Sequence, residues 1–134
     1  MSASRVRLVA LVAAALTIAA GLGARAAVAG AVAEYAGDAL YTVLLCALVV
    51  LVAPRLGRRP AVAAGLALAL SWAVEFAQLT GVPAELAAHS MAARLVLGST
   101  FNAPDLLWYA VGAGLAWACL ARAGFRDGER WRAR

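Results

Sequence analysis

The chain has 134 residues, of which 65% are hydrophobic and only 14% are charged. Soluble domains have about 25% charged residues, so this chain has too little polar surface to cover a globule in water. The formal net charge is +5, but the basic residues stand at the ends of apolar segments and form no nucleic-acid-binding motif. We therefore expect an all-α, polytopic membrane protein that does not bind nucleic acid.

Four apolar segments are long enough to cross the hydrocarbon of a bilayer, which takes about 20 helical residues. In chain order they are residues 6–23, 35–53, 61–80 and 104–121. Residues 1–26 also resemble a secretory signal that ends at an Ala-Arg-Ala cleavage site, and this alternative stays open. We expect a single integral membrane domain over residues 1–134.

Residues 81–103, between the third and fourth spans, are too polar to cross a membrane. Pro83 and Glu85 suit the first turn of a helix, and Leu86, Met91 and Leu95 follow at roughly helical spacing. This pattern predicts a short amphipathic helix in the second external loop, either at the membrane interface or against the bundle.

The arginines predict the orientation of the spans. Ten of the twelve lie before the first span, between the second and third, or after the fourth, and only Arg25 and Arg94 lie at the opposite ends. The positive-inside rule then places both termini and the basic tail, residues 122–134, in the cytoplasm. All basic residues are arginine, and alanine and glycine are abundant, which indicates a bacterial genome and the bacterial cytoplasmic (inner) membrane.

Small residues recur every four positions in the third and fourth spans. Such ridges allow two helices to approach closely in lipid. We interpret them as packing surfaces and not as recognition sites: Ala61, Gly65 and Ala69, and Ala110, Gly114 and Ala118.

Polar side chains occur where hydrocarbon is expected, and the predicted orientation places them at one level. Asp38 and Asp105 open the second and fourth spans, while Glu75 and Gln78 share a face in the outer half of the third. A charged group at the centre of a span costs roughly 2.5–3.5 kcal/mol on insertion scales. We therefore expect these groups to face the bundle interior, where they pair or bind a ligand.

Structural interpretations of the same residues remain open. Asn102, Pro104 and Asp105 are typical of a helix N-cap and first turn, in a pattern like a capping box. Asp38, in a first turn, would be stabilised by the helix dipole. An aromatic belt at the interface would account for Tyr35, Trp108 and Tyr109.

These residues stand in four motifs: YAGDALY at 35–41, EFAQL at 75–79, RLVLGSTF at 94–101 and DLLWYAVG at 105–112. Together they resemble a family of small bacterial four-span membrane proteins known only as a domain of unknown function. The similarity covers about residues 20–120, although the interval from Arg94 to Gly98 is shorter than in the family pattern. A more distant similarity links the motifs to VanZ-like proteins. The resemblance implies a site but no reaction.

Three functional hypotheses follow. In the first, an outward-facing polar pocket binds a small polar or lipid-headgroup ligand, with Arg94 holding an anion through two hydrogen bonds. In the second, the polar groups only hold the helices together in a structural or accessory subunit. The third is acid–base catalysis on an envelope precursor, and no nucleophile–base pair supports it. The candidate ligand-binding residues are Asp38, Glu75, Gln78, Arg94, Asp105, Tyr35, Tyr41 and Tyr109.

We expect no metal site and no cofactor. His89 stands alone in the loop, and neither Cys46 nor Cys119 has a metal-ligand neighbour. The expected partners are the lipid bilayer and a lipid-linked or small polar ligand, and a homo-oligomer is left open.

Overall fold

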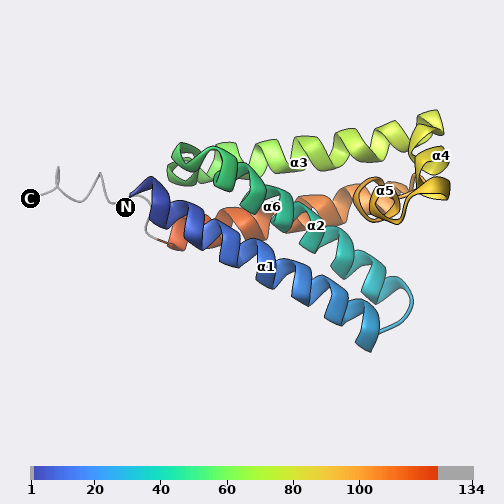
Figure 1. The fold of residues 1–134 in the computed structure, drawn as a ribbon, viewed down its shortest axis with the longest axis horizontal. Coiled ribbons are helices and arrows are strands. Elements are labelled where there is room, and N and C mark those ends of the chain that lie inside the picture. The colour runs from blue at the N-terminus through green and yellow to red at the C-terminus, as the bar shows by residue number, and fades with distance from the viewer. Residues whose placement is uncertain (1, 124–134) are drawn as a thin grey trace, which may run out of the picture.

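Four long helices form an up-and-down bundle in the computed structural model, which describes residues 2–123 (Figure 1). They are α1 (Ala3–Ala27), α2 (Ala31–Val52), α3 (Pro60–Ala77) and α6 (Ala103–Arg122). Each of the four, with α3 extended to Thr80, is long and apolar enough to cross a membrane. The all-α, four-span prediction is therefore confirmed, while most of the expected cytoplasmic tail, residues 124–134, lies outside the described residues.

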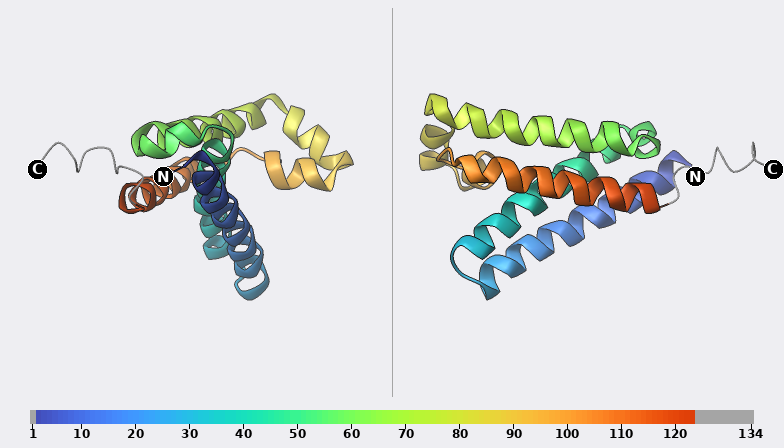
Figure 2. Two further views of the ribbon diagram at one scale, coloured as in Figure 1. Left: turned by 60° about the vertical axis from the view of Figure 1, so that its left-hand side comes forward. Right: turned by 180° about the vertical axis from the view of Figure 1, so that it is seen from behind.

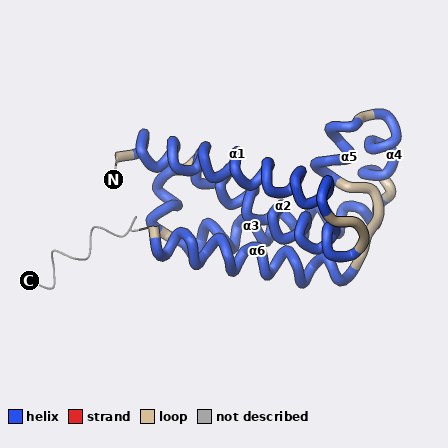
Figure 3. The backbone as a smooth tube through the Cα atoms, turned by 90° about the horizontal axis from the view of Figure 1, so that it is seen from below, coloured by secondary structure: helices blue, strands red, loops and turns tan. Residues whose placement is uncertain are grey.

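Short helices connect the long ones at opposite ends of the bundle, where the loops are also gathered (Figure 3). The 3-10 helix η1 (Pro54–Arg58) joins α2 to α3 at the end that holds the N-terminus, which we call the N-terminal end. At the other end, the α5 end, the turn η2 (Gln78–Thr80) leads into α4 (Val82–His89) and α5 (Met91–Leu97).

The loop between α3 and α6 therefore contains two short helices, where the sequence predicted one. Pro83 and Glu85 do lie in the first turn of α4, as expected. Ser90 ends that helix in an extended conformation and begins the next, since its hydroxyl accepts a hydrogen bond from Ala93 N at 3.2 Å. A serine cap of this kind satisfies a free N–H of the new helix, so the chain turns without a longer loop.

Helix α2 begins earlier than the sequence predicted. Gly30, with φ of 79°, precedes its first residue, Ala31, and such a backbone conformation favours glycine. The acidic residue in the first turn is Glu34, and Asp38 lies about two turns into the helix. The interpretation of Asp38 as a first-turn residue stabilised by the helix dipole is therefore wrong.

Helix α2 is the centre of the bundle. It packs against α1, α3 and α6, and α6 also packs against α3, whereas α1 packs mainly on α2. At the α5 end the α1–α2 pair diverges from α3 and α6 (Figures 1 and 2). This divergence matters for the site described below, because it leaves space between the two pairs that side chains only partly fill.

Two close approaches hold α2 in place. A Cβ atom added to Gly112 of α6 would overlap the backbone carbonyl of Ala39, so the two helices touch through main-chain atoms. On the other side, the hydroxyls of Thr42 and Ser71 form a hydrogen bond of 2.8 Å between α2 and α3, and both residues are 0% exposed. Close contact and polar pairing of this kind are typical of helix association in lipid.

The small-residue ridge predicted in α3 does not pack, and of the ridge predicted in α6 only Ala110 and Ala118 are half-buried. Ala61, Gly65 and Ala69 of α3 are all exposed, and so is Gly114 of α6. The small residues buried between the helices are instead Ala63, Ala64 and Ala67 of α3 and Gly112, Ala113 and Ala116 of α6.

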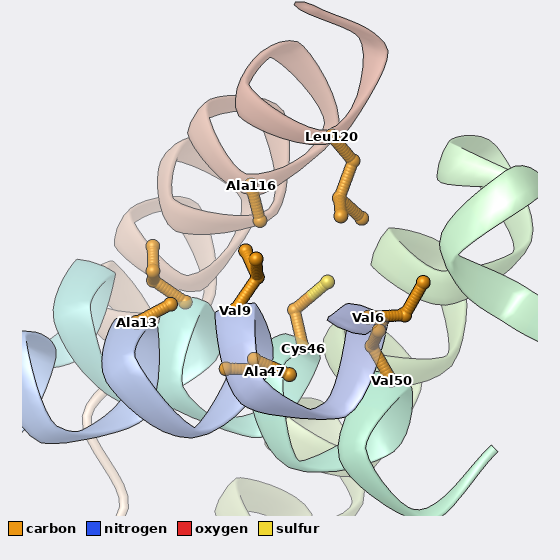
Figure 4. A pocket seen from close by; sticks show the side chains of 10 residues that line it. Val6, Val9, Ala13, Cys46, Ala47, Val50, Ala116 and Leu120 are labelled. Atoms are coloured by element: carbon orange, nitrogen blue, oxygen red, sulfur yellow. The ribbon is translucent and has the colours of Figure 1, made fainter. Parts of the chain in front are cut away.

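The half of the bundle towards the N-terminal end is apolar inside. A cavity of about 80 Å³ lies there between α1, α2 and α6, with Val6, Cys46, Val50 and Leu120 among the side chains around it (Figure 4). Buried polar pairs and acidic groups lie further along the helices. Polar chemistry is therefore concentrated in the other half of the molecule.

The two ends also differ in charge. The helix bounds place Arg25 and Arg94 at the α5 end. The other arginines of the described chain belong to the N-terminal end: Arg5, Arg7, Arg55, Arg58, Arg59 and Arg122. The sequence predicted this separation, and the membrane face that each end meets stays a prediction.

Candidate functional site

Glu75 lies near the end of α3 and is 0% exposed. Its Oε1 accepts a hydrogen bond of 2.7 Å from the backbone N–H of Asn102, and its Oε2 accepts one of 2.9 Å from the hydroxyl of Tyr109. Both donors belong to α6 or to the residue that caps it. Glu75 therefore faces the protein interior and ties α3 to α6.

The start of α6 has the predicted residues at the cap position and in the first turn, but no side-chain cap hydrogen bond. Asn102 is the N-cap, Pro104 lies in the first turn, and Asp105 is the first-turn acid, as the sequence predicted. In a capping box the side chain at Asp105's position would accept from the N-cap backbone N–H. Glu75 takes that N–H instead, and Asp105 Oδ1 accepts a hydrogen bond of 2.6 Å from Asn102 Nδ2.

Asp38 of α2 completes the acidic group. Its carboxyl group lies close enough to that of Asp105 for the two to interact electrostatically. Its Oδ2 atom is buried and has no hydrogen-bond partner among the described residues. The structure thus brings the three acidic side chains of α2, α3 and α6 together.

A cavity of about 120 Å³, which we call the polar cavity, lies beside this group at the α5 end. One water molecule needs only about 10–15 Å³ of such space, so the cavity can hold a larger group. Every long helix and α5 contribute to its wall. Its polar lining consists of Arg25, Asp38, Tyr41, Gln78, Arg94 and Tyr109.

Gln78 and Tyr41 hold α5 against the bundle. The amide Nε2 of Gln78 donates a hydrogen bond of 2.7 Å to the carbonyl of Leu97, and the hydroxyl of Tyr41 donates one of 2.9 Å to the carbonyl of Val96. The other amide atom, Gln78 Oε1, is buried and has no partner among the described residues. Gln78 therefore lines the polar cavity and has one buried acceptor, Oε1, without a partner among the described residues.

Gly98 makes this arrangement fit. It ends α5 with φ of 65°, and a Cβ atom there would lie 2.6 Å from Gln78 Nε2. Both the backbone conformation and the space require glycine. The family resemblance had included this glycine, but only the structure shows that it makes room for the Gln78 side chain.

Two cations reach the polar cavity without an acidic partner. Within residues 2–123, the guanidinium groups of Arg25 and Arg94 form no ion pair and no hydrogen bond. The sequence singled out Arg94 as an anion-binding residue and missed Arg25. The sequence did contain a signal for Arg25, because the distribution of arginines over the span ends predicts that Arg25 and Arg94 lie on the same, exterior side.

Other predicted site residues lie away from the polar cavity. Glu75 and Asp105 do not line it, although Glu75 accepts a hydrogen bond from Tyr109, which does. Tyr35 stacks on Trp108 with ring centroids 5.2 Å apart and also does not line the cavity. In the part of the chain that is described, no group of three or more His, Cys, Asp or Glu is placed to hold a metal ion.

A family model described as "Protein of unknown function (DUF2809)" matches residues 27–113. The chain belongs to this family. The DUF2809 segment runs from the last residue of α1 into α6, and it includes every polar residue of the cavity wall except Arg25. No curated protein and no solved structure matches the chain. Membership of a family of unknown function was expected from the four motifs and is confirmed, while the VanZ-like similarity and the bacterial origin stay predictions.

Proposed function

We propose that this membrane protein binds a small polar or lipid-headgroup ligand in the polar cavity. The observation that supports this best is a pair of buried acceptor oxygens without partners, Asp38 Oδ2 and Gln78 Oε1, on residues of one cavity wall. Buried polar atoms without partners are few in native proteins and cost about 1–3 kcal/mol each. A ligand that donates hydrogen bonds in the cavity would remove that cost.

The charges of the wall favour a ligand with an anionic part. Arg25 and Arg94 line the same cavity as the two free oxygens. Arginine binds phosphate and carboxylate groups well because its donors form a planar fork. A ligand that has both a negative group and hydroxyl or amine donors would therefore match the wall.

The proposed location follows from the separation of the arginines. With most of them at the N-terminal end, the positive-inside rule places that end in the cytoplasm and the polar cavity at the exterior face. The membrane would be the cytoplasmic (inner) membrane of a bacterium, with both termini in the cytoplasm. A protease or labelling assay on intact cells would test this topology.

Binding can be tested with glycerol 3-phosphate and phosphatidylglycerol as probes for the full-length chain in a non-ionic detergent. Arg94→Gln is the test variant, since its side chain has no partner to lose within the described residues. Arg5→Gln removes the same charge at the other end. At ten times its dissociation constant a ligand stabilises the fold by about 1.4 kcal/mol. We expect a rise in melting temperature with at least one probe for the wild type and Arg5→Gln, and a much smaller one for Arg94→Gln. If neither probe changes the melting temperature of the wild type, the proposal is wrong.

A structural function is the second candidate, and one observation favours it for Glu75. Both oxygens of this carboxyl group are already used inside the protein, by Asn102 N and Tyr109 Oη. Under this interpretation Glu75→Gln lowers the melting temperature without changing ligand binding. Loss of binding at an unchanged melting temperature would instead assign Glu75 to the binding site.

A further inference from the structure

The polar cavity continues into a second cavity of about 190 Å³, which we call the apolar groove. Four residues line both, so the two spaces adjoin at Arg25, Gly37, Tyr41 and Leu95. Beyond this junction the groove follows α1 and α2 with an almost wholly apolar wall. That wall includes Thr17, Ile18, Leu22, Leu40 and Leu44.

The dimensions of the groove match part of an acyl chain. From Thr17 to Arg25 it follows α1 for about 12 Å, at about 1.5 Å per residue. This is less than half of the roughly 30 Å of hydrocarbon in a bilayer. A chain in the groove would therefore be held by the protein near its head and would continue among the lipids. The divergence of the α1–α2 pair from α3 and α6, visible in Figure 2, lies at the same end of the bundle as the groove.

Polarity changes along the two cavities in the order in which it changes along a phospholipid. Asp38 and Gln78, each with a buried acceptor oxygen that has no partner among the described residues, line the polar cavity, Arg25 lines both cavities, and aliphatic side chains follow. A soluble phosphate compound would leave the groove without an occupant. A fatty acid would provide no donor for the two oxygens.

We infer that the two cavities together bind one phospholipid, with its phosphate at Arg25 and Arg94, a hydroxyl-bearing headgroup in the polar cavity, and the start of one acyl chain in the apolar groove. This inference rests on the proposed function and names the ligand class of the same site. Glycerol as the headgroup supplies two hydroxyl donors beside an anionic phosphate. Choline has no N–H or O–H donor, so it cannot satisfy the two oxygens.

The experiment compares three probes by native mass spectrometry of the full-length chain released from detergent micelles. Phosphatidylglycerol has the whole set of features, phosphatidylcholine has the same tails with a headgroup that lacks donors, and glycerol 3-phosphate has the head without the chain. We expect phosphatidylglycerol to bind at least ten times more tightly than either of the others. The intact mass also shows whether Arg25 is retained in the mature chain, as the inference requires.

Variants separate the contribution of the groove from that of the charges. Gly21 lines the groove and has no atom within 4 Å of an added Cβ, so Gly21→Leu adds a large side chain to the groove wall at a position with open space for its Cβ. Gly23 has equally open space and does not line the groove, so Gly23→Leu is the matched control. Arg25→Gln tests the phosphate contact, with Arg5→Gln as its control. We expect Gly21→Leu and Arg25→Gln each to weaken phosphatidylglycerol binding at least tenfold, and both controls to bind as the wild type does.

The outcomes distinguish this inference from the proposed function. Equal binding of the two phospholipids would mean an unselective lipid layer and would overturn the inference. If glycerol 3-phosphate bound as tightly as phosphatidylglycerol and Gly21→Leu had no effect, the ligand would be a small polar molecule, and only the proposed function would stand. If no probe bound, both would be wrong. Circular dichroism of each variant ensures that a lost signal reflects the site and not the fold.

Discussion

Removal of the Glu75 carboxyl group is expected to destabilise the bundle through two identified hydrogen bonds. Interhelical hydrogen bonds in membrane proteins contribute about 0.6 kcal/mol on average and about 1.7 kcal/mol at most. Glu75 accepts two, from Asn102 N at 2.7 Å and from Tyr109 Oη at 2.9 Å, so their loss accounts for about 1.2–3.4 kcal/mol. Glu75→Ala also leaves a space at a position that is 0% exposed. We therefore expect a total loss of about 2–4 kcal/mol.

Reversible unfolding of the full-length chain in mixed micelles, followed by circular dichroism, measures this free energy. Tyr109→Phe removes only the hydroxyl and should cost about 0.6–1.7 kcal/mol. In the double mutant that cost should disappear, because the hydroxyl no longer has its acceptor. Leu79→Ala, at a side chain that is 65% exposed, is the control and should cost little. Purely additive effects of Glu75→Ala and Tyr109→Phe would show that this hydrogen bond does not hold α3 to α6.

Two further predictions use glycine pairs with matched controls, both measured by the same unfolding assay. Gly112→Ala should cost about 1–3 kcal/mol because its Cβ would force α2 and α6 apart. Gly114 has open space around it, so Gly114→Ala should be neutral or slightly stabilising. Equal effects of the two variants would contradict the close approach of the two helices. Gly98→Ala and Gly30→Ala share the cost of a positive φ, but only the first crowds Gln78 Nε2. Gly98→Ala should therefore be the more destabilising of the two and should also weaken phosphatidylglycerol binding, and a larger effect at Gly30 would contradict this.

The number and order of the spans could be predicted because each depends on local sequence alone. A helix that crosses lipid must satisfy its own backbone hydrogen bonds, so apolar length determines the assignment. The ends were less accurate: α2 begins at Ala31 and not at residue 35, since its start depends on Gly30 and not on hydropathy. The break at Ser90 was missed for a similar reason. Hydropathy shows only that this residue is polar, whereas its role as the cap of α5 depends on the backbone conformation.

The common level of the acidic residues and the inward orientation of Glu75 were predictable, and the packing faces of the helices were not. A rise of about 1.5 Å per residue fixes depth once the ends are known. Which way a side chain points depends on how neighbouring helices pack, and alanine-rich helices have small residues on every face. The ridge at Ala61, Gly65 and Ala69 was therefore assigned to the wrong face. For the same reason, no motif showed that Glu75 would bond to a backbone N–H at residue 102.

The bonds of Glu75 also have a consequence for how the protein is inserted during synthesis. Both donors come from residues 27 and 34 positions later in the chain. When α3 leaves the ribosome, its buried acid has no partner, and a lone acidic group within lipid makes insertion of that segment unfavourable. We therefore expect α3 to wait at the translocon until α6 emerges, so that the two segments enter the bilayer as a pair. A nascent chain truncated before residue 102 should then leave α3 incompletely integrated, and Glu75→Leu should restore its integration.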